Sequence, residues 1–301
     1  MATRVAEAKA ADEILFQNDG VALCLLVNRR QRTLRVIDFR SGPHPAKRNF
    51  VMSLARREGV ERVFTLVERD ECSTWTRLGF RREGSIPGFY KRSDAFILGA
   101  DVITGEGDAD SEQSGLRPAY SDSAPESDGE RAYQQARKHW KGLALETLPP
   151  VRVAEARPAD VTKALSAAGR QGRALTGFEP FGRDVQRWFF CCTARGGFSL
   201  TASVETQPCF DNAYLELLTG PRTEKETRLV VSAVHKLCDE LLKREIVGCF
   251  ALAATDDLDL GAVFLANGFR KTGLLPRHLL RGKTRVDAFL WSRKLALPAD
   301  G

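Results

Sequence analysis

The chain has 301 residues, of which 43% are apolar and 28% charged, and its net charge is +6. This length exceeds that of a usual single domain, so two domains are expected. No run approaches the roughly 20 apolar residues that span a bilayer, and residues 1–13 lack the apolar segment of a secretory signal, which excludes a membrane protein and predicts a cytoplasmic one. The seven cysteines form no CxxC pair, which indicates buried free thiols and no metal site.

The first hundred residues alternate apolar strand-like runs with helical stretches and predict one α/β unit over residues 1–103. Residues 14–39 have room for two or three strands. The elements expected after the first strands are a strand over 33–39, a helix over 46–58, a strand over 62–67, a short helix ending at Leu78-Gly79 and a strand over 94–98.

Residues 104–130 are rich in Ser, Gly, Asp, Glu and Pro, and they contain eight acids and one base. This stretch has a net charge of −7, so the regions on either side of it carry +13 together. Because so few large apolar groups cannot offset the entropy of ordering, we expect a disordered linker. The basic flanks would attract an anionic cofactor, the linker or nucleic acid, but no RNP motif, zinc finger or KH loop supports the last of these.

Residues 131–301 predict a second unit, in which Thr223 and Glu226 form a capping box that opens a helix. The other elements expected are a helix over 131–142, a strand over 151–156, a helix after Pro158, a hairpin turning at Gly196-Gly197, strands over 213–218 and 247–253, a short helix ending at Asn267-Gly268 and a strand over 285–292. The first unit has no counterpart to the opening strand and helix, so it is predicted to be truncated.

An internal repeat relates the two halves. Residues 79–87 (GFRREGSIP) match residues 268–276 (GFRKTGLLP), with the same spacing from Gly to Gly to Pro. Similar strands follow, beginning at Asp94-Ala95-Phe96 and Asp287-Ala288-Phe289, and only the turn before them differs, by four residues. Similarity on this scale predicts two copies of one fold.

This order of elements, with a Gly-Phe pair after the short helix, resembles the GNAT superfamily of acyl-CoA-dependent N-acetyltransferases. The resemblance covers about residues 14–102 in part and 147–295 more fully. It implies an α/β (α+β) fold of tandem mixed β-sheets flanked by helices, with Phe80 and Phe269 in equivalent core positions. The two units could pack on each other as an intramolecular pseudo-dimer.

The resemblance also implies an acetyl-CoA site where the central strand of a unit runs into a helix, because N–H groups and the helix dipole hold the pyrophosphate there. Both loops lack the glycines of the family. Pro45 removes a donor from the first loop, and Glu224 and Glu226 would repel phosphate at the second. Charge favours the first loop, whereas completeness favours the second unit. On charge, the first loop is predicted as the site, with Glu68 as the nearest candidate base. The candidate cofactor-binding residues are Gly42, His44, Lys47, Arg48, Asn49, Arg222 and Lys225.

The catalytic positions that the resemblance implies are altered. Family members often carry a Tyr, which protonates the departing thiolate, where this chain has Trp75 and Phe264. Seven residues earlier, Glu68 and Asp257 replace an Asn and are candidate general bases for an amine. The alternative for both is a solvated charge after a strand. His278 is a further candidate base, and its alternative is an exposed loop histidine.

Two functions therefore stay open. One is an N-acetyltransferase that acylates an amine of a small molecule or protein, by direct attack of the amine on the thioester while backbone N–H groups hold the oxyanion. The other is a catalytically inactive GNAT-like scaffold that binds a protein or small-molecule partner, which the altered loops and the missing tyrosines favour.

Overall fold

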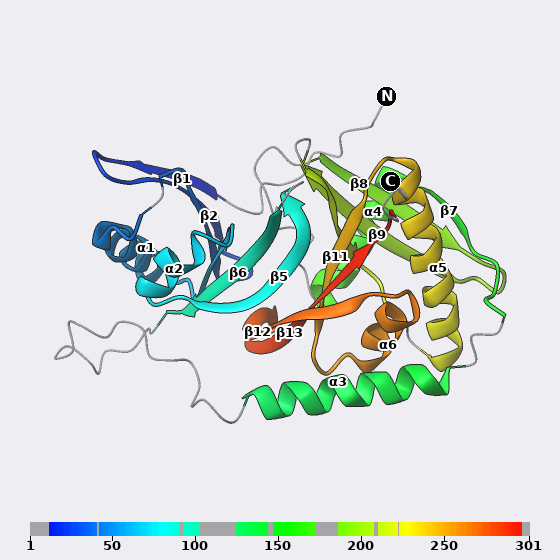
Figure 1. The fold of residues 1–301 in the computed structure, drawn as a ribbon. Coiled ribbons are helices and arrows are strands. Elements are labelled where there is room, and N and C mark those ends of the chain that lie inside the picture. Colours follow the sequence, from blue (N-terminus) through cyan, green and yellow to red (C-terminus); the bar gives the residue numbers. More distant parts are fainter. Residues whose placement is uncertain are drawn as a thin grey trace, which may run out of the picture.

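The described residues form one continuous sheet of thirteen strands in the computed structural model, with helices on both sides (Figure 1). The structure describes residues 12–40, 42–90, 93–102, 125–143, 147–171, 186–207, 210–221 and 223–296. The strands of the first unit are β1 (Asp12–Gln17), β2 (Ala22–Asn28), β3 (Thr33–Asp38), β4 (Arg62–Val67), β5 (Arg81–Tyr90) and β6 (Ser93–Asp101). Its helices are α1 (Pro45–Arg57) and α2 (Cys72–Arg77).

The second unit has one strand more. Its strands are β7 (Arg152–Glu155), β8 (Gln186–Thr193), β9 (Ser199–Gln207), β10 (Phe210–Leu217), β11 (Gly248–Ala254), β12 (Arg270–Arg281) and β13 (Thr284–Lys294). Its helices are α3 (Pro125–Gly142), α4 (Pro158–Gln171), α5 (Glu224–Lys243) and α6 (Leu258–Ala266).

The order of the strands confirms the tandem repeat. Across the sheet the order is β1-β2-β3-β4-β6-β5-β12-β13-β11-β10-β9-β8-β7. Counted outward from the contact of β5 with β12, the order is β5-β6-β4-β3-β2-β1 in the first half and β12-β13-β11-β10-β9-β8 in the second. The two orders are equivalent, and β7 is an additional edge strand. In each half a single pair is parallel, β3 with β4 and β10 with β11. Among the described residues, the first unit has no counterpart of β7 and α4, as the sequence predicts.

The repeated sequence motif forms β5 and β12, which the sequence did not predict as strands. Both strands carry a register shift at the same place, after Ile86 and after Leu275. There the N–H groups of Gly88 and Arg277, both with positive φ, donate to an Asp carboxylate at 2.8 Å. The acceptors are Asp94 and Asp287, so the Asp of each Asp-Ala-Phe segment stabilises the irregular part of the neighbouring strand.

Each unit has a hydrophobic core of its own on the side of the sheet that carries its long helix. Phe80 and Phe269 are 1% and 2% exposed, which confirms their prediction as equivalent core residues. Their neighbours are equivalent too. The ring centroids of Trp75 and Phe80 lie 4.8 Å apart, and those of Phe264 and Phe269 lie 5.1 Å apart.

A third apolar cluster joins the two units. It lies on the sheet faces turned away from α1 and α5, where Phe64 and Ile97 of the first unit pack with residues such as Phe250 and Leu290 of the second. The strands β5 and β12 meet in antiparallel register at Gly84 and Gly273. These glycines are equivalent in the repeat, so the units are related as the subunits of a two-fold dimer are.

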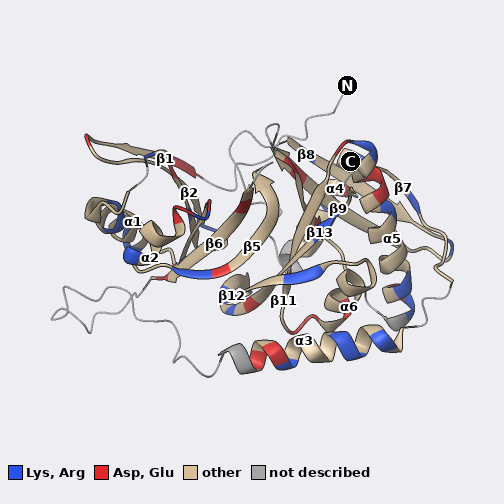
Figure 2. Ribbon diagram, in the orientation of Figure 1, with Lys and Arg blue, Asp and Glu red and all other residues tan. Residues whose placement is uncertain are grey.

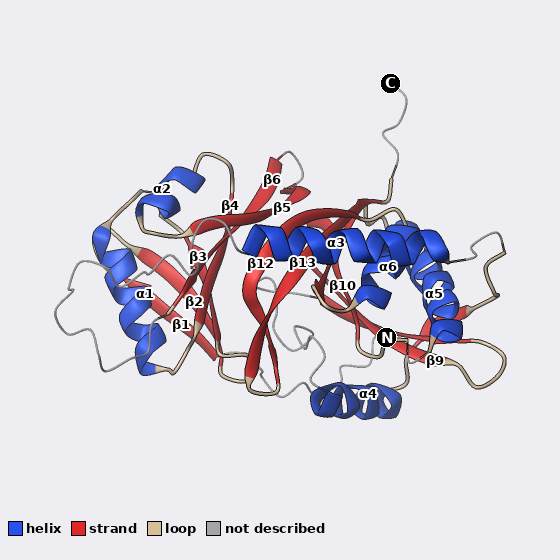
Figure 3. Cartoon of the chain, turned by 90° about the horizontal axis from the view of Figure 1, so that it is seen from below, coloured by secondary structure: helices blue, strands red, loops and turns tan. Residues whose placement is uncertain are grey.

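Helix α3 begins at Pro125, so the last six residues of the expected linker, 125–130, are helical instead; residues 103–124 lie outside the described part. Proline suits the first turn of a helix. The helix packs along α6, where Ala136 lies against Gly261, and Lys271 forms an ion pair with Glu130 at 3.0 Å (Figures 1 and 3). In Figure 2 the described part of α3 has acidic residues toward its beginning and basic residues toward its end, which complements the helix dipole.

Within the described residues, no helix combines the length and apolar character needed to cross a membrane. The same residues contain no group of three or more His, Cys, Asp or Glu side chains placed to hold a metal ion. Four of the six described cysteines are buried, and all six are free thiols.

Candidate functional site

The parallel ladder at the centre of each unit is short. Strands β10 and β11 pair only from Asn212 to Tyr214 and from Gly248 to Phe250, although they continue to Leu217 and Ala254. In the first unit the ladder likewise ends at Val36 and Thr65. Beyond the last pair, the N–H and C=O groups of the two strands no longer bond to each other across the ladder.

The loop of the first unit uses its charge internally. The Lys47 ammonium is fully buried, 2.5 Å from a carboxylate oxygen of Asp38 and in hydrogen-bonding contact with the carbonyl of Arg40. Lys47 thus joins the end of β3 to the first turn of α1. The sequence suggested a cation for an incoming phosphate, whereas the structure gives Lys47 a buried partner.

The N–H groups at the start of α1 are also engaged. His44 caps the helix, and its Nδ1 accepts from the N–H of Ala46 at 3.2 Å, while the N–H of Lys47 bonds to the carbonyl of His44. Pro45 has no N–H to offer. Gly42 has a φ of +119°, which a glycine tolerates, and Arg48 is half-buried beside an exposed Asn49.

The start of α5 keeps more of its donors. The hydroxyl of Thr223 accepts from the N–H of Glu226 at 3.3 Å, which confirms one half of the predicted capping box. The N–H groups of Glu224 and Lys225 lie in the first turn of α5, which contains no proline, and helix geometry gives neither of them an intrahelical acceptor. Lys225 is exposed, and Arg222 lies outside the described residues. On backbone donors, the second loop is the better anion site.

The two candidate bases are not equivalent in space. Glu68 is exposed and accepts a hydrogen bond from the Ser93 hydroxyl at 2.7 Å. Asp257 is the N-cap of α6 and accepts from the N–H of Leu260 at 3.1 Å. Helix α2 has six residues and α6 has nine, so α2 begins three residues closer to its Gly-Phe pair than α6 does. The N-cap of α2 is therefore Glu71. Counting back from the Gly-Phe pair therefore aligned Glu68 with Asp257, whereas the structure aligns Glu71 with it.

His278 is not an exposed loop residue. It lies in β12 with 2% of its surface exposed, and its ring packs edge-on against Phe64 at 5.0 Å. Burial, together with the nearby charges of Arg62 and Arg285, holds the pKa of His278 well below its ordinary value. It is a buried neutral side chain between the two units.

A buried polar face that the sequence did not predict lies on β8, β9 and β10 of the second unit. Arg187 forms a buried ion pair with Glu205 at 2.8 Å, and Glu216 is 4% exposed. By strand register, the counterparts of Arg187, Glu205 and Glu216 in the first unit are Glu13, Leu26 and Ile37, respectively. Helix α4 contacts β9 from the side of the sheet opposite α5 (Figure 3). The signal in the sequence was an acid between Leu215 and Leu217.

Glu216 lies two residues beyond Tyr214, where the β10–β11 ladder ends. Its carboxylate therefore projects from the part of β10 that no longer pairs with β11. A buried carboxylate in this place can hold a cationic amine or take a proton from it.

Comparison with known proteins gives weak likenesses. No family model matches the chain, and no curated protein matches it. Among solved structures, it is similar to the ribosomal-protein-S18-alanine N-acetyltransferase from Escherichia coli, with 17% identity and a TM-score of 0.37 over 50% of this chain and 98% of that one. It is also similar to spermidine N-acetyltransferase from Vibrio cholerae in complex with CoA and spermine, with 9% identity and a TM-score of 0.40 over 48% and 95% of the two chains.

Mycobacterium smegmatis RimJ in complex with CoA-disulfide is similar over 56% of this chain and 78% of its own, with 15% identity and a TM-score of 0.34. Each of these three matches covers about half of this chain. With TM-scores below 0.5, they assign no activity to it.

Proposed function

We propose that this chain is an acyl-CoA-dependent N-acyltransferase and that its second unit carries the reaction. The observation that carries the proposal is the position of Glu216, a buried carboxylate on β10 just beyond the end of the parallel ladder. The first unit has Ile37 at this position, and its loop is closed by the ion pair of Lys47 and Asp38. The first unit then serves as an inactive scaffold for the second.

The residues around the start of α5 fit the pyrophosphate of an acyl-CoA. The N–H groups of Glu224 and Lys225 are donors at a helix N-terminus, and the Lys225 ammonium adds positive charge. The Glu226 carboxylate of this turn opposes binding, so we expect an affinity below that of a glycine-rich loop. When bound, acyl-CoA supplies the acyl group as a thioester.

The chain's own groups then have defined tasks. Backbone N–H groups between Leu215 and Leu217 or between Ala251 and Ala254 are suited to hold an oxyanion. Glu216 takes the proton from the attacking amine, the new C–N bond forms and the C–S bond breaks. Phe264, where the family often has a Tyr, has no proton to give, so the thiolate takes its proton from water.

The test uses the full chain, with acetyl-CoA binding measured by calorimetry and thiol release measured with spermine and a peptide α-amine as acceptors. We expect Lys225→Glu to weaken acetyl-CoA binding, whereas Arg48→Glu, at the corresponding loop of the first unit, leaves it unchanged. Glu216→Gln should keep acetyl-CoA binding and lower kcat/KM by about 10²–10⁴. Glu68→Gln and Asp257→Asn, tested in parallel, should reduce the rate less.

A wild-type chain that does not bind acetyl-CoA would reject the proposal and favour the scaffold function. Loss of binding in Arg48→Glu, with normal binding in Lys225→Glu, would place the cofactor in the first unit. Full activity of Glu216→Gln would remove Glu216 as the base and leave Asp257 as the nearest candidate.

A further inference from the structure

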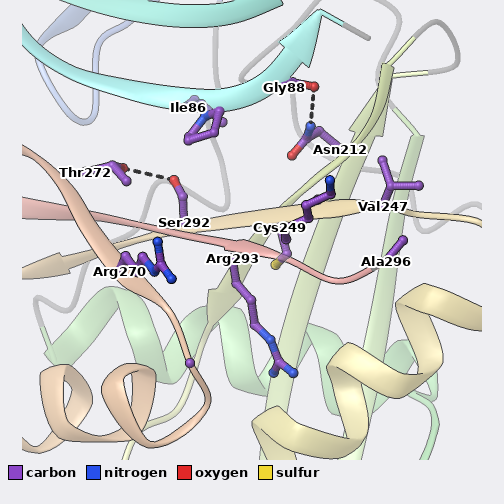
Figure 4. A pocket seen from close by; sticks show the side chains of 14 residues that line it. Ile86, Gly88, Asn212, Val247, Cys249, Arg270, Thr272, Ser292, Arg293 and Ala296 are labelled. Atoms are coloured by element: carbon purple, nitrogen blue, oxygen red, sulfur yellow. Dashed lines mark hydrogen bonds between the residues drawn. The ribbon is translucent and has the colours of Figure 1, made fainter. Parts of the chain in front are cut away.

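A cavity of about 770 Å³ lies between the two units, at the end of the sheet where β10 and β11 begin. The proposed acyl site is at the opposite end of these strands. The first unit contributes the irregular part of β5, from Ile86 to Gly88, and the second contributes the ends of its central strands. Asn212 donates to the carbonyl of Gly88 at 2.9 Å across the boundary (Figure 4). The cavity is therefore incomplete without both units.

The cavity is basic. Arg270, Arg293 and Lys294 line it, and no Asp or Glu is among the described residues that do so. Neither Arg270 nor Lys294 forms an ion pair with another described residue. The side chain of Arg293 points toward α5, where it interacts with the Cys238 thiol (Figure 4). The hydroxyls of Thr272 and Ser292, 3.0 Å apart, lie on the same wall (Figure 4). Unpaired cations next to hydroxyls are typical of a site for an oxyanion.

The equivalent place in the first unit is filled by its own side chains. Arg62 is fully buried there, with both carboxylate oxygens of Glu83 as partners and a contact of 3.3 Å to Asp101. Register identifies the counterparts, because Arg62 pairs with Asp101 in the sheet as Gly248 pairs with Lys294. Thr272 takes the place of Glu83. The second unit thus lacks the arginine that fills the space and has replaced both acids by a neutral and a basic residue.

We propose that this cavity binds a small organic anion, a molecule whose carboxylate or phosphate group is held by Arg270, Lys294 and the Thr272–Ser292 hydroxyls. Its volume is that of a site for a small organic molecule and exceeds what a bare inorganic ion needs. Pro87 and Val247 give it an apolar wall for the carbon skeleton. Because β5 of the first unit forms part of the wall, the bound anion stabilises the contact between the units.

The test is calorimetric titration of the full chain with citrate, ribose 5-phosphate and inorganic phosphate in separate arms. We expect saturable binding of one molecule per chain for citrate or ribose 5-phosphate, and the responding arm identifies the carboxylate or phosphate class. In Arg270→Gln/Lys294→Gln the affinity should fall roughly tenfold or more, as expected for lost charge-assisted hydrogen bonds. The matched control is Arg81→Gln, the equivalent of Arg270 beside the filled site, which should bind normally.

A second variant tests the space itself. Asn212→Thr/Gly248→Arg/Thr272→Glu/Lys294→Asp installs the residues of the first unit, and it should keep the far-UV spectrum while losing the anion. Three results overturn the proposal: no saturable organic anion binding by wild type, equal weakening in Arg81→Gln, or binding of inorganic phosphate only, which indicates an adventitious ion only. Acetyl-CoA binding must stay normal in Arg270→Gln/Lys294→Gln. Loss of acetyl-CoA binding in this variant would show that the cavity is part of the acyl-CoA site.

Discussion

Gly84 and Gly273 face each other where the two halves of the sheet meet, and neither position has room for a side chain. A Cβ on Gly273 would lie 2.6 Å from the Cα of Gly84 and 2.7 Å from the carbonyl oxygen of Glu83. A Cβ on Gly84 would lie 3.0 Å from the Cα of Gly273. The second glycine of the sequence repeat is thus required where the units approach most closely.

We therefore expect Gly273→Ala to destabilise the chain by about 1–3 kcal/mol, the usual cost of overpacking, because the obstructing atoms belong to the backbone. Urea unfolding measures the loss. The matched control is Gly142→Ala at the end of α3, where a Cβ would meet nothing within 4 Å. Equal stability of the two variants would show that β5 and β12 do not approach each other this closely.

Phe80→Ala and Phe269→Ala should each cost about 3–5 kcal/mol, because each removes a fully buried ring from the core of one unit. Denaturant unfolding with fluorescence detection gives both values. Leu242→Ala, at a position 45% exposed, is the control and should have a small effect. A loss below about 1 kcal/mol at either Phe would contradict the equivalence of the two cores.

Lys47→Met should cost about 3–5 kcal/mol, since it leaves the Asp38 carboxylate buried without its partner. The double variant Lys47→Met/Asp38→Leu should recover most of the loss, because no buried charge then remains unpaired. Lys236→Met, which breaks the exposed pair with Asp239, should change stability by about 1 kcal/mol or less. A harmless Lys47→Met would mean that the ammonium is free and available to a phosphate.

His278 should make the chain less stable in mild acid. Its pKa in the folded chain lies well below the ordinary value of about 6.5, so below that pH the unfolded chain binds a proton that the folded chain does not. The free energy of unfolding then falls with decreasing pH, by at most about 1.4 kcal/mol per pH unit from this residue, until the folded pKa is reached.

His278→Phe tests this expectation, because the first unit has the buried Phe89 at the equivalent position. Urea unfolding at pH 7.5 and pH 5.5 should show a smaller acid loss in the variant than in wild type. His235→Gln, at an exposed position on α5, is the control for the loss of a histidine. An identical pH dependence of wild type and His278→Phe would show that His278 takes up its proton in the folded chain.

The sequence predicted the tandem fold well because the repeat reports on backbone geometry. Phe80 and Phe269 were identified as core residues from that pattern alone. Strands β5 and β12 were not predicted, because Gly84, Pro87 and their counterparts interrupt the alternation of apolar and polar residues and because one neighbour of each strand belongs to the other unit.

The candidate site was harder to predict, since it depends on which residues meet in space. Lys47 looked like a free cation because nothing in the local pattern shows that the loop folds it back onto Asp38. Glu205 and Glu216 become a site only through the register of β8, β9 and β10. His278 looked exposed because Pro276 and the basic residues around it suggest a loop.

The joining of two equivalent units in one continuous sheet has a consequence for how each can change. In a dimer of identical subunits every substitution appears on both sides of the axis, so the two halves of the boundary must stay alike. Within a single chain the sequences of the two halves can differ. One side of the axis has Arg62 with its acidic partners, and the other has Gly248 beside a cavity. One half therefore stabilises the boundary with its own side chains, and the equivalent space in the other half can bind a ligand.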